Sequence, residues 1–450
     1  MAKAFESDKD TKLDFSTAIT TLIERIDTCS TGQVRFVQSI EKCGYLKQDT
    51  LIDWLEAQPL FPKFYWQDRE GTEQVAALGQ MYTFHHPAPA YTILGEQQRV
   101  WGGRAFSPSS KGKGCLSSFF FLPIIELVEN DGAWHFVVNT NRSKSDAIAA
   151  LNELSFDYSV LGRVATQITQ TKHSPEKKQW CDLVDHALSD IAADKFKKVV
   201  LARKTTVELS RKVSAAQITK SSRDSNHNSF HFLFAMDAGH SFIGSTPERL
   251  YRRIGRVLNT EALAGTTGRG HSFDEDSALA QWLSNDKKNI NENQYVVDDI
   301  LERLELLAEH IQVDDQATLI RLRQVQHLKR SIYAQLNEGV KGVELLEALQ
   351  PTAAVAGLPR HSSLAFIEEN EPFIRGWYAG SVGYLGHEKA EFCVAIRSAL
   401  VVDDVIHLFA GAGIVPGSKA EHEWQELDKK LLTLLSLLGE ENTENLGVYQ

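Results

Sequence analysis

Three runs of strand-forming residues follow one another near the end of the chain with no helical segment between them. They are WYAGSVGYLG at 377–386, AEFCVAIRSALVV at 390–402 and VIHLFAGAGIV at 405–415. Antiparallel strands can be joined by a tight turn, whereas parallel strands need a long crossover, usually a helix. The pattern therefore indicates a mixed α/β or α+β body with antiparallel sheets and not a doubly wound sheet.

Other parts of the chain show the same short strands. The predicted strands are 64–71, 76–84, 119–128, 135–139, 198–208, 229–236, 241–244 and 249–260. The Asp131-Gly132 pair predicts the turn of a hairpin that ends in HFVVN at 135–139. A loop rich in Ser, Gly and Lys is predicted over 104–114.

Four segments place apolar residues at helical spacing. They are about 15–26, 174–194, 286–311 and 420–438. Because no linker of biased composition divides the chain, we expect a single body. Within it, residues 1–175 form an N-terminal region and residues 176–450 form the catalytic region.

Composition excludes several classes of protein. The net charge of −11 and the lack of a basic stripe argue against nucleic acid or an anionic membrane as a partner. The five cysteines are odd in number and form no CxxC pair, so a reducing cytoplasm is expected. No apolar stretch approaches the roughly 20 residues of a membrane span, and the N-terminus shows no apolar signal segment.

Two predicted helices carry carboxylates that could bind a metal ion. Glu423, Glu426 and Lys430 share one face of the last helix, and Glu292 lies in the first turns of the long helix. Carboxylates from two helices could hold Mg²⁺, which takes one or two of them together with water and substrate oxygens. A solvent-exposed acidic face is the alternative interpretation. The histidines are scattered, so a histidine metal site is not indicated.

The glycine-rich run AGAGIVPGS at 410–418 does not have the spacing of a dinucleotide loop. Its glycines fit a close approach of the backbone to a ligand carboxylate. Arg397 follows an apolar run and could hold a carboxylate with both arms of its guanidinium. Lys198 and Glu248, each at the end of a predicted strand, would on their own be assigned to structure or surface.

Taken together, nine ordered segments resemble the conserved segments of the chorismate-utilising enzymes. The segments are KVVLARK (198–204), FIGSTPERL (242–250), EALAGTTGRG (261–270), NENQYVVDDI (291–300), QHLKRSI (326–332), LQPTAAVAGLP (349–359), AEFCVAIRSAL (390–400), LFAGAGIVPGS (408–418) and EWQELDKK (423–430). The resemblance covers about 185–440 and is closest to the menaquinone-type isochorismate synthases. Two segments of the N-terminal region, FYWQDRE (64–70) and VWGGRAF (100–106), also resemble that branch.

The resemblance implies a fold of antiparallel sheets packed as a sandwich with helices outside. It implies Mg²⁺ as cofactor and chorismate as substrate, bound by a monomer or a homodimer. The implied roles are Glu292 and Glu426 as metal ligands, Glu423 as a ligand through water, Arg397, Gly411, Lys430, Gly265 and His327 as substrate-binding residues, Lys198 as general base and Glu248 as general acid.

The implied reaction adds water at C2 of chorismate while the C4 hydroxyl leaves. A base must take a proton from water and an acid must protonate the leaving hydroxyl, and burial would raise the pKa of a glutamate acid as required. Lys198 favours water as nucleophile, because the ammonia-using relatives do not carry lysine there. Asn289 stands where some siderophore-pathway relatives have glutamate, which argues against that branch.

Two alternatives remain open at this stage, and a third is disfavoured. A salicylate synthase would form isochorismate and then eliminate pyruvate in the same site. A siderophore-pathway isochorismate synthase would catalyse the same first reaction. A catalytically inactive chorismate-binding regulator would lack Lys198, Glu248 or a metal glutamate, all of which are present.

Overall fold

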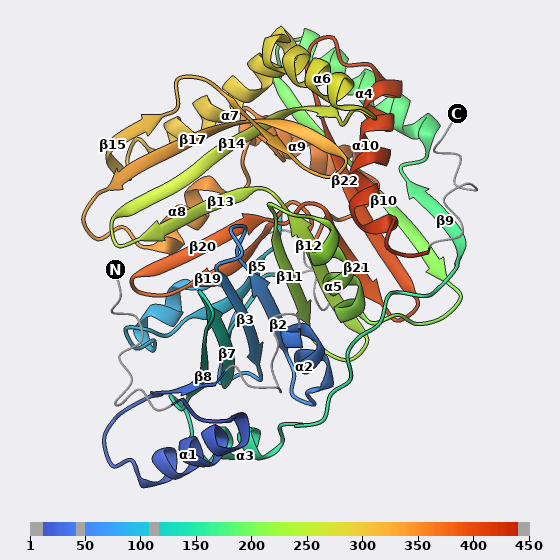
Figure 1. Ribbon diagram of the computed structural model, residues 1–450. Helices are drawn as coiled ribbons and strands as arrows, with labels where there is room; N and C mark the ends of the chain where they lie inside the picture. Colours follow the sequence, from blue (N-terminus) through green and yellow to red (C-terminus); the bar gives the residue numbers. More distant parts are fainter. Residues whose placement is uncertain (1–11, 42–49, 108–116, 440–450) are drawn as a thin grey trace.

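The computed structural model describes residues 12–41, 50–107 and 117–439, and two large sheets dominate them (Figure 1). The first sheet has twelve strands. In spatial order they are β1 (Arg35–Ile40), β8 (Ala133–Asn139), β7 (Ile125–Asn130), β3 (Glu73–Leu78), β2 (Lys63–Gln67), β11 (Phe230–Ala235), β12 (His240–Thr246), β21 (Ser398–Val402), β22 (Val405–Ile414), β10 (Lys198–Leu209) and β18 (Gly357–Leu358), with β9 (Ile168–Ser174) paired to β10.

The second sheet has ten strands. In spatial order they are β15 (Ala308–Val313), β17 (Val325–Leu336), β14 (Val257–Gly268), β13 (Arg249–Ile254), β20 (Lys389–Val394), β19 (Ser381–Leu385), β5 (Val100–Arg104), β6 (Phe119–Leu122) and β4 (Tyr82–Phe84), with β16 (Thr318–Arg321) paired to β17. The named strands pair antiparallel throughout both sheets. Each sheet combines strands from the N-terminal and C-terminal parts of the chain.

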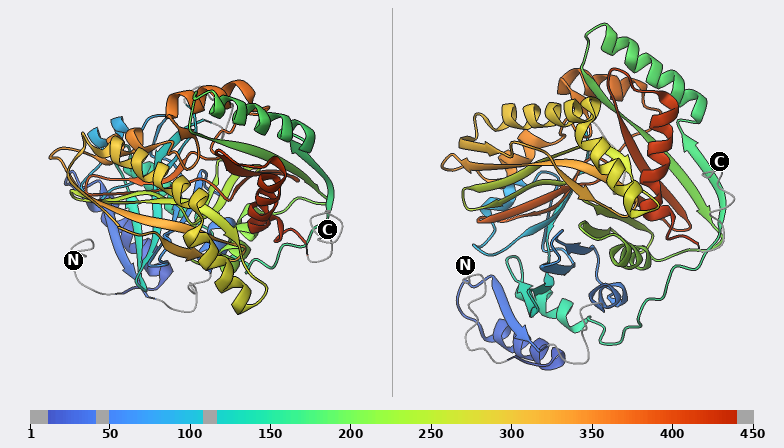
Figure 2. Two further views of the ribbon diagram at one scale, coloured as in Figure 1. Left: turned by 90° about the horizontal axis from the view of Figure 1, so that it is seen from above. Right: turned by 45° about the horizontal axis from the view of Figure 1, so that its top comes forward.

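Helices lie around the two sheets. They are α1 (Phe15–Thr28), α2 (Leu51–Ala57), α3 (Lys144–Asn152), α4 (Lys177–Ala192), α5 (Ala215–Ser225), α6 (Phe273–Asn285), α7 (Lys287–Leu304), α8 (Gly342–Leu349), α9 (Arg360–Asn370) and α10 (Ala420–Leu435), with a short 3₁₀ helix at Ala88–Thr92. Figure 1 and the right view of Figure 2 place α6, α7 and α10 together at one end of the molecule, opposite α1 and α3. Within the described part of the chain, none of the helices has the length and apolar character of a membrane span.

An aromatic layer joins the two sheets. Phe64 and Phe234 of the first sheet and Trp101 and Phe121 of the second belong to one buried cluster, in which the rings of Phe121 and Phe234 are stacked 5.8 Å apart. Burial of such rings contributes much of the hydrophobic stabilisation between layers. The predicted fold class, antiparallel sheets packed as a sandwich with helices outside, is therefore confirmed.

Several predicted strands are divided in the structure, because apolar pattern alone does not show where a chain turns or changes sheet. The run 249–260 is a hairpin of β13 and β14 that turns at Gly255, whose φ is +58°. The run 119–128 is divided at Pro123 into β6 and β7, which belong to different sheets. The run 390–402 is divided into β20 and β21, again in different sheets.

The predicted helix 286–311 is too long. The helix α7 ends at Leu304, and Ala308–Val313 forms the edge strand β15 on β17. The helix begins where Asp286 accepts a hydrogen bond from the backbone N–H of Asn289 at 2.9 Å. The other three predicted helices correspond to α1, α4 and α10. Residues 108–114 of the predicted loop lie outside the described residues, and the division of the chain at residue 175 stays a prediction.

Candidate active site

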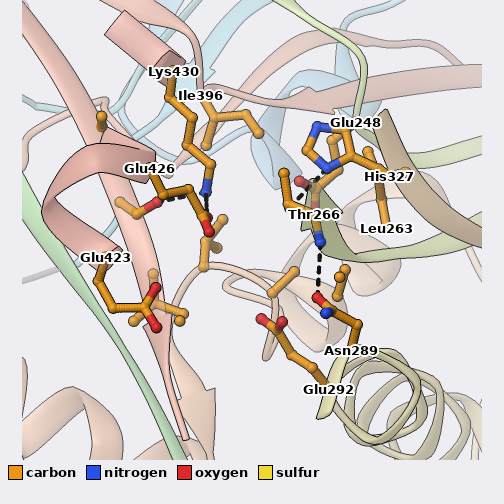
Figure 3. Close-up of a pocket in the computed structure, with 18 of the residues that line it drawn as sticks. Glu248, Leu263, Thr266, Asn289, Glu292, His327, Ile396, Glu423, Glu426 and Lys430 are labelled. Atoms are coloured by element: carbon orange, nitrogen blue, oxygen red, sulfur yellow. Dashed lines mark hydrogen bonds and ion pairs between the residues drawn. The ribbon is translucent and has the colours of Figure 1, made fainter. Parts of the chain in front are cut away.

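One cavity of about 350 Å³ gathers the predicted site residues. Its walls come from α7, α10, β14 and β22 and from the segments that join the two sheets. Figure 3 shows Glu423 and Glu426 of α10 across the cavity from Glu292 of α7. The predicted residues in its lining are Glu248, Gly265, Glu292, His327, Arg397, Gly411, Glu423, Glu426 and Lys430.

Lys198 lies directly behind this lining. It is the first residue of β10, its side chain is fully buried, and its Nζ lies 3.0 Å from Glu292 Oε1. The contact is an ion pair without the geometry of a hydrogen bond. A Cβ atom on Gly413 would lie 2.6 Å from Glu292 Oε1 and 3.1 Å from Lys198 Cε, so glycine at this position leaves the space in which the two groups meet.

The other two acidic residues are also paired with lysine. Glu426 Oε1 lies 2.7 Å from Lys430 Nζ, and Glu423 Oε1 lies 3.1 Å from Lys288 Nζ. Burial, followed by the nearby carboxylate of Glu426, raises the pKa of Glu423. The site is therefore a cluster of carboxylates that needs positive charge close to it.

The cluster fits a hard cation. Carboxylate oxygens are the donors that Mg²⁺ takes in proteins, and one or two of them suffice when water and substrate complete the shell. In the described part of the chain, His, Cys, Asp and Glu side chains do not form any ready-made group of three metal ligands. A cation here would depend on water and substrate oxygens as well as on Glu292 and Glu426.

Glu248 lies between β12 and β13 and is 5% exposed. Burial raises the pKa of its carboxyl group to about 8, and the nearby Glu261 acts in the same direction. The positive charges of Lys198, Lys430 and Arg397 act against this shift but do not cancel it. Glu248 can therefore hold a proton at neutral pH, as a general acid must.

Glu248 and Arg397 lie on two neighbouring segments that pass from one sheet to the other. Glu248 connects β12 of the first sheet to β13 of the second, and Arg397 connects β20 of the second to β21 of the first. The N–H of Val394 donates to the carbonyl of Glu248 at 2.9 Å, and the N–H of Ser245 donates to the carbonyl of Arg397 at 3.1 Å. The two crossing segments are thus joined to each other through the backbone.

Arg397 and His327 form a fixed pair. Nη2 of Arg397 donates to Nε2 of His327 at 3.0 Å, and Nη1 donates to Oγ1 of Thr433 at 3.2 Å. Because a guanidinium can only donate, Nε2 of His327 carries no proton, and Nδ1 donates to Oγ1 of Thr266 at 2.9 Å. Burial, then the charge of Arg397, lowers the pKa of His327 well below its usual range, so the ring is neutral.

Gly265 lies at a kink of β14 with φ of +86°, where a Cβ would lie 3.1 Å from the carbonyl oxygen of Asn289. The N–H of Thr266 donates to Oδ1 of Asn289 at 3.1 Å. Asn293, one turn further along α7, donates through Nδ2 to the carbonyls of Ala262 and Ala264. The kinked strand is therefore fixed to the helix that carries Glu292.

Gly411 contributes its carbonyl, which accepts from Nζ of Lys430 at 2.8 Å. A Cβ on Gly411 would lie 2.6 Å from the hydroxyl of Tyr378, so glycine lets this buried tyrosine reach the cavity. The sequence did not single out Tyr378, Lys288, Asn293 or Gly413. Of these four residues, only Gly413 was indicated, by the glycine spacing of the run 410–418.

Comparison with known proteins identifies similar sequences. A sequence model described as "Chorismate binding enzyme" matches residues 87–439. The chain is 41% identical to isochorismate synthase MenF of Escherichia coli over 86% of this chain and 90% of that protein. It is 38% identical to isochorismate synthase MenF of Haemophilus influenzae over 91% of this chain and 92% of that protein.

A solved structure has a similar fold. The structure of MenF from Escherichia coli, described in its title as the menaquinone-specific isochorismate synthase, superposes with a TM-score of 0.86. The match has 37% sequence identity and covers 94% of this chain and 99% of that one.

Proposed function

Because the chain belongs to the family of chorismate-binding enzymes, we propose that it is an isochorismate synthase, an isomerase that converts chorismate to isochorismate for menaquinone formation in the cytoplasm. The observation that carries this function is that two buried residues lie at one cavity, Glu248 in its lining and Lys198 directly behind it, where it contacts Glu292. A lysine and a carboxyl group with a raised pKa are the base and acid that hydroxyl transfer requires.

Substrate binding depends on local positive charge. Chorismate carries two carboxylates, and a protein with a net charge of −11 repels it at long range. We assign one carboxylate to Arg397, whose two terminal nitrogens can meet both oxygens, and the other to the region of Lys430 and the Gly411 backbone. The neutral ring of His327 then holds the guanidinium of Arg397 in place.

Mg²⁺ is the proposed cofactor. Glu292 and Glu426 would hold it, with Glu423 contacting its waters, and the bound ion would supply positive charge beside a substrate carboxylate. Gly265 and the strand around it would lie against the substrate ring. The Asn289 and Asn293 contacts would keep this wall at a fixed distance from Glu292.

The proton transfers balance within the site. Lys198 takes a proton from the water that bonds to C2 while the double bonds of the ring shift. Glu248 gives its proton to the oxygen that leaves C4, so water is consumed at one carbon and released at the other. Each of the two groups contributes about 10²–10⁴-fold to the rate.

The test is a product analysis with chorismate and Mg²⁺. Isochorismate as the only product supports the proposal, whereas salicylate with pyruvate would assign the chain to the salicylate synthases. Lys198→Ala should remove turnover, while Lys204→Ala, a lysine further along the same strand, should keep it. Turnover that does not change when Mg²⁺ is removed with a chelator would contradict the cofactor assignment. Light scattering would decide between monomer and homodimer.

A further inference from the structure

The segment FYWQDRE, at 64–70, includes Arg69, which lies in the turn between β2 and β3 of the first sheet. Although this turn belongs to the N-terminal region, it reaches the segment that carries Glu248. Nη1 of Arg69 donates to the carbonyl of Pro247 at 2.8 Å, directly before the proposed general acid. The mechanism described above does not use this contact.

The same guanidinium binds Glu261, the residue that opens the EALAGT segment of β14. Nη1 and Nη2 of Arg69 donate to Oε1 and Oε2 of Glu261, the second at 3.0 Å. The pair is buried, with side-chain exposures of 10% for Arg69 and 3% for Glu261. A bidentate pair of this kind has a well-defined geometry as well as strength.

Glu261 also holds the other side of Glu248. Its Oε1 accepts a hydrogen bond from the backbone N–H of Arg249 at 3.1 Å. The carbonyl before Glu248 and the N–H after it are therefore both bound by one buried ion pair. Solvent-exposed ion pairs, by contrast, contribute little to stability.

We propose that Arg69 and Glu261 are positioning residues for Glu248, which fix the backbone on both sides of the general acid and set the charge behind its carboxyl group. The proposal rests on the proposed function, in which Glu248 is the acid. It gives a role to an N-terminal segment that lies outside the catalytic region expected from the sequence.

The charges around Glu248 come from every side. Glu261 on β14 favours the protonated carboxyl, while Lys198 on β10, Lys430 on α10 and Arg397 between β20 and β21 favour the ionised one. Tyr378 and Cys393 also interact with Glu248, and burial raises the pKa of each of them. Glu261 is the nearby negative charge that most favours the acid form of Glu248.

The two partners should therefore act in opposite directions. Glu261→Gln removes the negative charge and takes from Arg69 its bidentate partner, so both changes favour ionised Glu248. Arg69→Gln leaves Glu261 without its counter-ion and favours protonated Glu248. A purely structural pair would lower stability in both variants without moving a titration in opposite directions.

The experiment is a pH profile of kcat for isochorismate formation by the full chain. We expect the high-pH limb, where Glu248 loses its proton, to move down by about one pH unit in Glu261→Gln and to move up in Arg69→Gln. Glu126→Gln is the matched control, because the Arg35–Glu126 pair has exposures of 12% and 0% and lies away from the cavity. It should lower thermal stability and leave the limb unchanged.

A second readout does not depend on turnover. The infrared band of the protonated carboxyl, assigned by subtracting the Glu248→Gln spectrum, reports the titration of Glu248 directly. If the titration midpoint of this band moves down in Glu261→Gln and up in Arg69→Gln, the proposal is supported even if the chain catalyses another reaction of the family. Identical midpoints in all variants overturn it. If Glu261→Gln did not fold, Arg69→Gln with an unchanged limb and an unchanged band would overturn it equally.

Discussion

Nζ of Lys198 lies 3.0 Å from a carboxylate oxygen of Glu292, so the proposed base and a proposed metal ligand are in direct contact. Their contact exists because residue 413 is glycine. Cation binding by Glu292 and proton transfer by Lys198 therefore depend on neighbouring atoms. A substitution at Gly413 should disturb both functions together.

Gly413→Ala should damage activity more than stability. Its methyl group would enter the 2.6 Å space beside Glu292 Oε1 and push the carboxylate and Lys198 apart. We expect kcat to fall about 10–100-fold, because small displacements of reacting groups have large effects on rate. Gly268→Ala is the control, since its Cβ would meet only Lys429 Nζ at 3.5 Å. Equal kcat values in the two variants would contradict the role of Gly413.

Lys288→Met should tighten Mg²⁺ binding. Lys288 is paired with Glu423, and its ammonium also interacts with Glu292 and Glu426. Removing this positive charge should lower the Kd for Mg²⁺ about threefold to tenfold, as measured by titration calorimetry. Lys287→Met, from the exposed neighbouring position, should change Kd little. Weaker binding in the Lys288 variant would show that this lysine supports the site instead of competing for it.

Glu248→Gln should change how stability depends on pH. Burial raises the pKa of Glu248 from 4.5 to about 8, so the folded protein keeps a proton that the unfolded chain releases between these values. The stabilisation is complete below about pH 4.5 and is lost as the pH rises towards 8. Between about pH 5 and 8.5 the Tm of the variant should fall less than that of the native protein.

The control for this measurement is Glu421→Gln, because Glu421 is exposed and forms a surface ion pair with Lys177. Its Tm should follow the native protein across the whole range. A Glu248→Gln variant with the native pH dependence would show that Glu248 does not titrate in this window.

Arg397→Lys should fail almost as badly as Arg397→Ala. The guanidinium donates to both His327 and Thr433, and a single ammonium cannot reproduce this together with a bidentate grip on a carboxylate. We expect kcat/KM for chorismate to fall about 10²-fold in both variants. Arg256→Lys, at an exposed ion pair with Glu309, should be close to the native enzyme. A lysine variant with native kinetics would show that Arg397 acts only as a point charge.

The sequence pattern predicted a mixed body of antiparallel strands because short strands and turns are local features, and the sandwich packing came from the resemblance to the family. It did not predict where the chain changes sheet, because the run 390–402 is apolar on both sides of Arg397. The backbone there adopts a φ of +50°, which is uncommon for arginine and is not indicated by its neighbours. The overlong helix has a similar cause, since Leu307 and Ile311 continue the helical spacing, but α7 ends before Leu307, and Ile311 pairs with Ala334 of distant β17.

The predicted site residues came from ordered motifs, and the structure brings them to one cavity. The residues that the sequence missed act between segments far apart in the chain. Arg69 and Glu261 are 192 positions apart, and Lys288 and Glu423 are 135 apart. Spacing along a helix or strand carries no information about such pairs, so only the fold could reveal them.

The proposed acid and the proposed carboxylate-binding arginine both lie on crossing segments and on neither sheet. The distance between them is therefore a property of how the two layers stack. A substitution in the aromatic layer, far from any substrate atom, would alter that stacking and reach Glu248 and Arg397 simultaneously. Turnover should therefore depend on how the two sheets pack together. Substitutions that alter it need not line the cavity.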